Sequence, residues 1–210
     1  MIKIEGQLLG PLGTNCYFVT NDETKEMVII DPPVFLQRIA DEIREKGLTL
    51  RAILLTHGHY DHAMGVPGFK KAFPEVPVYA SESEAEVLMD PAVNLSRMFG
   101  EKALSASADV LLEDEEKFEL IGCEWKFLLT PGHTRGSGCY YIPERGVLFS
   151  GDTLFCRSMG RTDFPTGSER SLFESLRRLR DLPDDTVVYP GHMDATVIGD
   201  EKKYNPFMNR

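Results

Sequence analysis

Short apolar runs, most of them bounded by Gly, Pro, Asp or Asn, recur along the chain and predict β-strands. The first few follow one another closely enough to predict a series of hairpins. The predicted strands span residues 2–9, 16–20, 27–30, 52–55, 76–79, 118–120, 125–129, 139–142, 147–150 and 186–189.

Three segments between these runs are expected to be helical. Residues 34–46 and 168–181 repeat apolar side chains at the spacing of one helix face. These side chains are Phe35, Ile39 and Ile43 in the first segment and Leu172, Phe173, Leu176 and Leu179 in the second. Ser81 and Glu84 have the spacing of a capping box, so we expect a helix over residues 85–89.

Strand-rich halves that each carry helices predict two packed sheets with helices outside, an α/β sandwich. The 210 residues suit a single domain over residues 1–210. We find no repeat, low-complexity segment or linker. The stretch 90–107 has no regular pattern, and we expect a mobile surface segment there.

All five histidines fall in three short segments, each directly after a predicted strand. A lone histidine is more often a packed or surface residue than a ligand. Five of five at strand ends instead indicates a shared site, because loops held by a rigid scaffold are where functional residues gather. The three segments carry His57, His59 and His62, then His133, then His192; Asp152 follows a fourth strand in the same way.

Imidazole and carboxylate groups without thiol pairs are typical of a catalytic metal site, because structural zinc sites are usually rich in Cys. Alternate residues of an extended loop point the same way, so His57 and His59 can reach one ion. Zn suits these ligands best, and Fe or Mn is also compatible. The predicted ligands are His57, His59 and His133 for one ion, Asp61, His62 and His192 for a second, and Asp152 for both.

Two divalent ions give this arrangement a chemical purpose. A bound ion lowers the pKa of water from about 15.7 to about 7. That change is worth roughly 12 kcal/mol in deprotonation at about 1.36 kcal/mol per pKa unit. A second ion helps to hold the hydroxide and to stabilise the oxyanion that forms. We expect Asp61 to be catalytic as well, by orienting the attacking hydroxide.

Composition disfavours several other classes. The net charge is −10 and no run of Lys or Arg is present, which argues against nucleic-acid partners. No apolar run approaches the roughly 18–20 residues of a membrane span, and the first residues lack a signal-peptide pattern. We therefore expect a cytoplasmic protein without a membrane partner. The four cysteines lack CxxC spacing and are expected to be reduced, mostly buried thiols, with Cys156 close to a proposed ligand. The sequence leaves the oligomeric state open.

The string His57-x-His59-x-Asp61-His62, followed by His133, Asp152 and His192, resembles the signature of the metallo-β-lactamase superfamily. Order and separation match over residues 14–207. The resemblance implies an αβ/βα sandwich, two mixed sheets flanked by helices, with a dinuclear site at one edge.

Segments 56–62, 151–155 and 160–165 are similar to the glyoxalase II-like hydrolases, including their short single-domain bacterial members. This similarity implies hydrolysis of a small thioester, S-D-lactoylglutathione, to D-lactate and glutathione. The best-understood of these hydrolases bind glutathione through basic residues of a further helical domain, and this chain ends soon after its last histidine. The resemblance therefore supports the thioester chemistry better than the glutathione specificity.

A few further residues are candidates for contacts with substrate or ligands. An ordinary surface or packing role is the alternative for each of them, and Arg161 can simply pair with Asp163. Asp31 matches a family position that supports the metal-ligand loop, although an aspartate before proline also suits a plain turn. The candidates for substrate are Tyr60 at the pocket mouth, with Arg157, Arg161, Lys202, Lys203 and Tyr204 for a carboxylate.

Other members of the superfamily fit less well. Zinc β-lactamases of the commonest type have Cys at the position of Asp152 and are exported. Oxygen-reducing diiron members usually have Glu at the position of His59 and an added flavin domain, and RNA-processing members conflict with the acidic charge. A persulfide dioxygenase, with one iron held by His57, His133 and Asp152, stays open. So does hydrolysis of another small ester or lactone, whereas an inactive binding module is disfavoured because no ligand is lost.

Overall fold

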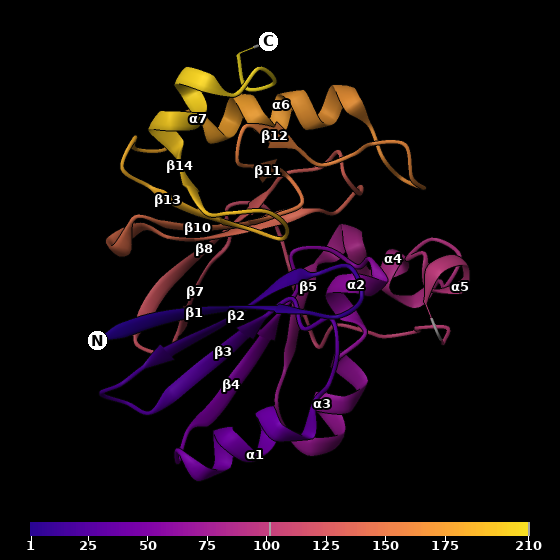
Figure 1. Ribbon diagram of the computed structural model, residues 1–210, viewed down its shortest axis with the longest axis vertical. Helices are drawn as coiled ribbons and strands as arrows, with labels where there is room; N and C mark the ends of the chain where they lie inside the picture. Colours follow the sequence, from indigo (N-terminus) through magenta and orange to yellow (C-terminus); the bar gives the residue numbers. More distant parts are fainter. Residues whose placement is uncertain (101, 210) are drawn as a thin grey trace.

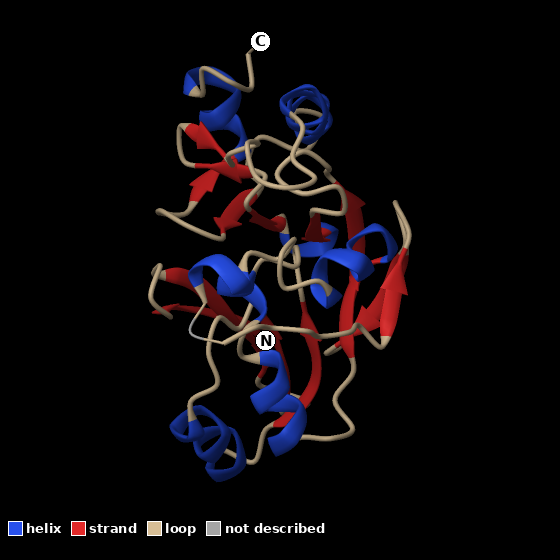
Figure 2. Cartoon of the chain, turned by 90° about the vertical axis from the view of Figure 1, so that its right-hand side faces the viewer, coloured by secondary structure: helices blue, strands red, loops and turns tan. Residues whose placement is uncertain are grey.

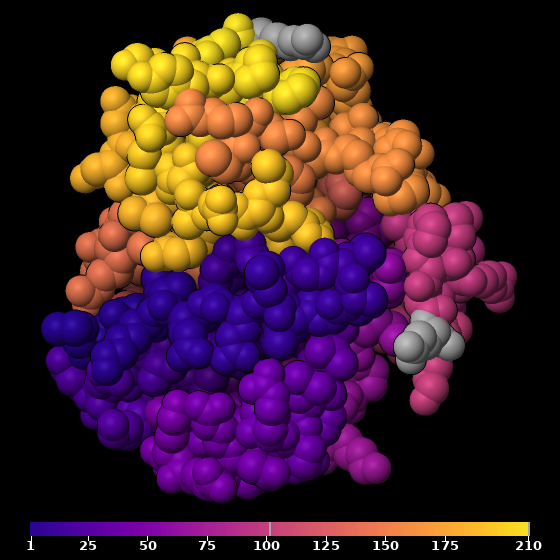
Figure 3. Space-filling view, in the orientation of Figure 1, coloured from indigo at the N-terminus to yellow at the C-terminus, as the bar shows by residue number. Residues whose placement is uncertain are grey.

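Two six-stranded sheets face each other, and helices cover the outer face of each (Figures 1 and 2). The computed structural model describes residues 1–100 and 102–209. The first half of the chain forms the lower part of the molecule and the second half forms the upper part (Figure 3). The predicted αβ/βα sandwich is confirmed.

The N-terminal sheet has the order β1-β2-β3-β4-β5-β6. Strands β1 to β3 pair antiparallel and strands β3 to β6 pair parallel, which makes the sheet mixed. Its strands are β1 (Ile2–Leu9), β2 (Thr14–Asn21), β3 (Glu26–Ile30), β4 (Thr49–Leu54), β5 (Val78–Ser81) and β6 (Val110–Leu112).

The C-terminal sheet has the order β14-β13-β10-β9-β8-β7, with only the pair β10 and β13 parallel. A two-stranded ribbon, β11 (Leu154–Phe155) and β12 (Ser158–Met159), follows β10. The strands of the sheet are β7 (Lys117–Leu120), β8 (Cys123–Leu129), β9 (Gly138–Ile142), β10 (Val147–Gly151), β13 (Val187–Pro190) and β14 (Thr196–Val197).

Helices α1 (Gln37–Glu45) and α3 (Val66–Ala72) lie below the first sheet, and α6 (Glu169–Leu179) and α7 (Ile198–Tyr204) lie above the second (Figure 1). The short helices α2 (Tyr60–Ala63), α4 (Ala85–Met89) and α5 (Ser96–Phe99) gather at one end of the sandwich. Single-turn 3₁₀ helices cover Glu82–Glu84 and Pro143–Arg145. Among the described residues, no helix is long and apolar enough to cross a bilayer.

Strand β3 shows how the N-terminal sheet packs against other elements on both of its faces. Successive side chains of a strand point to opposite sides. Met27 and Ile29 belong to the core under α1 and α3, whereas Val28 and Ile30 belong to the core between the two sheets. The inter-sheet core includes Trp125, which stacks on Phe149 at 6.0 Å between ring centroids. This packing fixes the sheets against each other and positions the loops at their edge.

Three local expectations differ from the structure. The first helix begins at Gln37, and Phe35 packs against Phe69 from the preceding loop. The prediction of a capping box is wrong. The Ser81 hydroxyl accepts from the Ser83 N–H, and the Glu84 carboxylate accepts hydrogen bonds from other loops instead. The stretch 90–107 contains α5 and buries Leu95 and Leu104.

Cysteine placement follows the expected pattern. Cys16, Cys123 and Cys139 are buried, Cys156 is half-buried, and all four are free thiols.

Candidate metal centre

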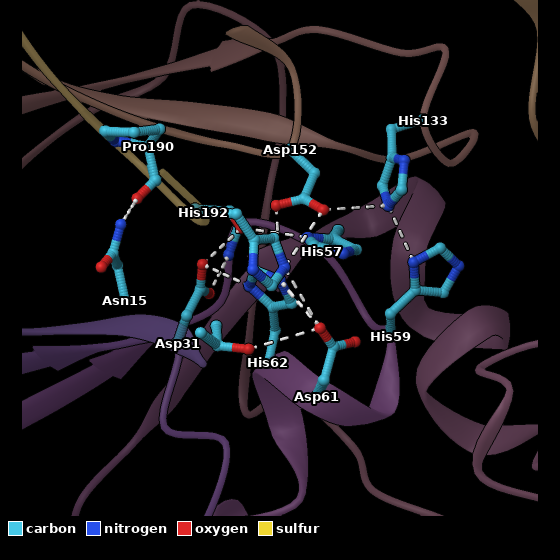
Figure 4. Close-up of polar contacts among 12 residues, drawn as sticks. Asn15, Asp31, His57, His59, Asp61, His62, His133, Asp152, Pro190 and His192 are labelled. Atoms are coloured by element: carbon cyan, nitrogen blue, oxygen red, sulfur yellow. Dashed lines mark hydrogen bonds and ion pairs between the residues drawn. The ribbon is translucent and has the colours of Figure 1, made fainter. Parts of the chain in front are cut away.

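Loops from both sheets bring the seven predicted metal-binding side chains together (Figure 4). His57 and His59 follow β4, and Asp61 and His62 lie on α2. The remaining three side chains follow strands of the other sheet: His133 after β8, Asp152 at the end of β10, and His192 after β13. All are buried except His192, whose side chain is 24% exposed.

The predicted ligand sets coincide with two of the clusters in the structure. One ligand atom from each of His57, His59 and His133 lies within 4.8 Å of the others, and the same is true of Asp61, His62 and His192. His59 Nδ1 and His133 Nε2 are 2.9 Å apart. Each cluster therefore has the dimensions of a three-ligand site.

Asp152 lies between the two clusters. Its Oδ1 is 3.4 Å from His62 Nε2, and its Oδ2 is 3.6 Å from His133 Nε2 and 3.7 Å from His192 Nε2. One carboxylate therefore reaches both clusters, as the proposed shared ligand requires.

Unsatisfied polar atoms indicate that these side chains suit a cation. His57 Nε2, His62 Nε2 and Asp152 Oδ1 are buried without a hydrogen-bond partner among the described residues, and so is His59 Nε2. A buried polar atom left unpaired costs about 1–3 kcal/mol. Imidazole nitrogens and carboxylate oxygens are ligands that divalent transition metals accept. The donor set therefore fits such ions.

The electrostatics of the clusters point the same way. Burial, reinforced by neighbouring imidazoles, lowers the pKa of His57 and of His59, which favours the neutral imidazole that binds metals. Burial also lowers the pKa of His62, but Asp152, Asp61 and Asp31 more than compensate and raise it to about 10. The carboxylates around His62 thus call for a positive charge, which a divalent cation supplies.

Asp31 supports the ligand loop from behind. Its Oδ1 accepts a 2.8 Å hydrogen bond from the Thr56 N–H, and its Oδ2 accepts a 2.6 Å bond from the Thr56 hydroxyl. Asp31 Oδ2 is also 3.0 Å from His62 Nδ1, and Thr56 Oγ1 is 3.1 Å from His57 Nδ1. Such outer contacts fix the orientation of ligating imidazoles. The geometry therefore suits the supporting role that the sequence suggested.

Glu84 connects the two loops that carry the first cluster, a role that sequence reasoning missed. Its carboxylate accepts from the Gly58 N–H at 2.8 Å, and from the Thr134 hydroxyl and the Gly136 N–H at 2.9 Å. Gly58 lies between His57 and His59, and Thr134 follows His133. Burial raises the pKa of Glu84 to about 7, although these hydrogen bonds lower it. The only signal in the sequence was the Ser81–Glu84 spacing, which suggested a cap instead.

Strand β2 supports the second cluster, and this too was missed. The Thr14 hydroxyl donates to Asp61 Oδ2 at 3.3 Å. Asn15 and Tyr17 each donate to the Pro190 carbonyl, at 2.9 and 2.7 Å. These bonds fix the loop that carries His192 (Figure 4).

The family model for the Metallo-beta-lactamase superfamily matches residues 9–192, a span that includes all seven side chains. The chain belongs to this superfamily. Together with the two His/Asp clusters, this makes it a metallo-hydrolase with a His/Asp metal site.

Curated relatives and solved structures match nearly the whole chain. "Probable metallo-hydrolase YqgX" of Bacillus subtilis is 36% identical, over an alignment that covers 96% of this chain and 95% of the relative. "Hydroxyacylglutathione hydrolase GloC" of Haemophilus influenzae is 36% identical, covering 93% and 92%. The structure of BLEG-1 B3 metallo-beta-lactamase has a TM-score of 0.91 at 37% identity, covering 99% and 100%. TTHA1623 in a di-iron-bound form has a TM-score of 0.84 at 36% identity, covering 97% and 99%.

A cavity of about 550 Å³ opens onto the clusters of this superfamily member, and His59, Asp61, His133, Asp152 and His192 lie on its wall. Of the substrate candidates, Tyr60 and Arg161 line it.

The other candidates lie elsewhere. The Arg157 guanidinium lies 4.4 Å from the centre of the Tyr204 ring, and Lys203 Nζ lies 4.7 Å from the same centre. Lys202 binds the Leu182 carbonyl and Asp184. None of these four residues is part of the cavity wall as the structure describes it.

Proposed function

We propose that the chain hydrolyses thioesters with two divalent ions, Zn first and Fe or Mn as alternatives, bound at the two clusters. The observation that carries this proposal is Asp152, whose two oxygens face both clusters and which lines one cavity with them. S-D-lactoylglutathione is the first substrate to test, because the Haemophilus relative is named a hydroxyacylglutathione hydrolase. A single domain over residues 1–210 and a cytoplasmic location remain part of this proposal.

When bound, the ions lower the pKa of water to about 7 and so supply hydroxide near neutral pH. His57, His59 and His133 would hold one ion, Asp61, His62 and His192 the other, and Asp152 both. Burial raises the pKa of Asp61, but His62 and His192 lower it by a larger amount. The net pKa lies below its usual value, so this side chain remains a carboxylate. The Thr14 hydroxyl donates a hydrogen bond to Asp61 Oδ2. The Asp61 carboxylate can also accept a hydrogen bond from the nucleophile and so orient the nucleophile.

The cavity wall favours a leaving group that needs no proton. Apart from the proposed ligands, its described titratable side chains are Tyr60 and Arg161. Burial and Asp61 raise the pKa of Tyr60, which makes it a weak proton donor. A thiol has a pKa of about 8.5, so the C–S bond can break to release a thiolate directly. An amine, in contrast, must be protonated as the C–N bond breaks. The wall therefore supports a thioester over an amide as the substrate.

The test is hydrolysis of S-D-lactoylglutathione by the metal-loaded protein, followed as thiol release, with metals per chain measured in parallel. We expect steady turnover with two ions per chain and none after chelation. A metal-loaded protein that leaves every thioester intact would overturn the proposal.

Hydrolysis of a β-lactam is a second candidate, because BLEG-1 is described as a B3 metallo-beta-lactamase and is 37% identical. A chromogenic cephalosporin assayed beside the thioester decides between the two.

The persulfide dioxygenase alternative has its own test. Oxygen uptake with glutathione persulfide, by protein holding one iron, would favour it over hydrolysis.

A further inference from the structure

The cavity above the two clusters has mostly apolar walls. Its polar lining residues are largely the proposed ligands themselves. The walls include Leu12, Phe99, Phe155, Met159, Phe164 and Met193. A volume of about 550 Å³ lies within the range of small-molecule sites. The space is thus larger than the reacting thioester group alone requires.

Three of these wall residues remain exposed although they are large and apolar. Leu12 is 56% exposed, Phe99 52% and Met193 55%. They come from separate parts of the chain: the turn between β1 and β2, helix α5, and the loop after β13. Apolar side chains that converge from three elements on one opening mark a binding surface.

The same walls offer little to a negatively charged ligand. Arg161 is the single Lys or Arg among the described wall residues. Its guanidinium donates to both carboxylate oxygens of Asp163 at 2.7 Å and lies 3.9 Å from the centre of the Phe164 ring. The cation is therefore already paired and stacked. The chain as a whole carries a charge of −10, and the two divalent ions of the proposed function, at +4 together, would leave it at −6, which still disfavours anions.

We propose that the cavity selects thioesters with an apolar acyl group of several carbon atoms, and that it does not recognise the carboxylates of a glutathione group. This inference rests on the proposed thioester hydrolysis. An apolar chain lies against the three exposed side chains and the aromatic walls, and the carbonyl group reaches the two clusters.

The experiment varies the two halves of the substrate separately. Acetyl, butanoyl and hexanoyl thioesters of uncharged N-acetylcysteamine test the acyl side. We expect kcat/KM to rise about fourfold per methylene buried. D-Lactoyl thioesters of glutathione and of N-acetylcysteamine test the thiol side, and we expect no gain from glutathione. A flat acyl series, or a tenfold preference for the glutathione ester, would overturn the inference while leaving thioester hydrolysis intact.

Variants locate the effect in the cavity. Leu12→Ser combined with Phe99→Ser should reduce the gain per methylene to about twofold or less. Met89→Ser is the matched control, because Met89 is 51% exposed and lies outside the cavity wall. Equal acyl dependence in both proteins would contradict the assignment of the walls.

Binding of stable analogues separates this inference from the proposed function. Hexyl thioethers of N-acetylcysteamine and of glutathione cannot be hydrolysed, so calorimetry reports the cavity alone. We expect the uncharged hexyl thioether to bind at least as tightly as S-hexylglutathione and more tightly than its methyl analogue. If no thioester is hydrolysed but this order holds, the proposed function fails and the apolar selectivity stands. The reverse order overturns the selectivity.

Discussion

At the scale of single residues, Asp152 and His59 have different positions that predict different losses. Asp152 faces both clusters, whereas His59 contacts only the first. Asp152→Ala should release both ions and His59→Ala chiefly one. Each should reduce thioester hydrolysis more than about a hundredfold, beyond the 10–100-fold effect of an outer contact. Elemental analysis of metals per chain checks this, and two ions retained by Asp152→Ala would refute the shared role.

Glu84 supports a second residue-scale prediction. A Gln amide offers one acceptor oxygen, whereas the Glu84 carboxylate accepts from Gly58, Thr134 and Gly136. Glu84→Gln should therefore destabilise the fold by about 1–3 kcal/mol. It should also weaken metal binding by about 10–100-fold. Urea unfolding and chelator competition measure the two effects.

The control for this prediction is Glu86→Gln. Glu86 is two residues away, its side chain is 74% exposed, and it pairs with Arg135. We expect nearly unchanged stability and metal affinity for the control. Equal metal affinities in the two variants would show that Glu84 does not position the ligand loops.

At the scale of elements, helix α6 packs on the loop that carries His133. The Ser168 N–H donates to the Gly132 carbonyl, and the Ser175 hydroxyl donates to the Pro131 carbonyl, both at 2.8 Å. Gly132 has φ of 140°, and a Cβ atom there would lie 2.4 Å from Leu172 Cα. Only glycine fits this approach of loop to helix.

Gly132→Ala should therefore disturb the first cluster from outside it. Backbone strain alone costs about 1–3 kcal/mol, and the clash with α6 adds to it. Gly47→Ala is the control, because Gly47 also has positive φ, of 63°, but nothing lies within 4 Å of an added Cβ. Thermal unfolding and metal content should both decrease for Gly132→Ala, whereas only stability should decrease for the control. Full metal content in Gly132→Ala would argue against this role of the helix.

Element boundaries also show what sequence patterns could and could not predict. Short apolar runs and the turn residues that bound them located the ten longer strands to within a few residues, because each strand has its own local signal. The elements that were not predicted are short. Strands β6, β11, β12 and β14 have two or three residues, and helices α2, α3, α5 and α7 have four to seven, too few to show a clear period. The contacts of Glu84 depend on loops about 26 and 50 residues away, which local spacing cannot reveal.

The clusters themselves were easier to predict from sequence than their supports. Histidine is rare in this chain, and its position after strands carries information that Thr14 or Thr56, common residues in ordinary strands, do not. The convergence of His57, His59 and His133 in space agrees with the grouping that the sequence suggested.

At the scale of the whole molecule, each cluster combines side chains from segments that follow strands of both sheets. His57 and His59 follow β4 of the N-terminal sheet, and His133 follows β8 of the C-terminal sheet. In the second cluster, Asp61 and His62 on α2 meet His192, which follows β13. Bound ions would therefore connect the two halves of the sandwich and favour the folded state.

Chelation should lower the melting temperature accordingly. An ion present at about 100 times its Kd stabilises the fold by about 2.7 kcal/mol. For a chain of this size that corresponds to roughly 5–10 °C. Scanning calorimetry with and without chelator measures the shift, and Asp152→Ala should show little of it. Identical melting of wild-type protein with and without chelator would contradict metal binding at these clusters.

The order of the side chains along the chain has a consequence for synthesis on the ribosome. His57, His59 and His133 are all synthesised before β13, whereas the second cluster waits for His192. The three imidazoles of the first cluster are therefore already present on a nascent chain whose last strands are still missing. The second cluster is complete only after translation has passed β13, so any ion bound during synthesis is expected at the first cluster before the second.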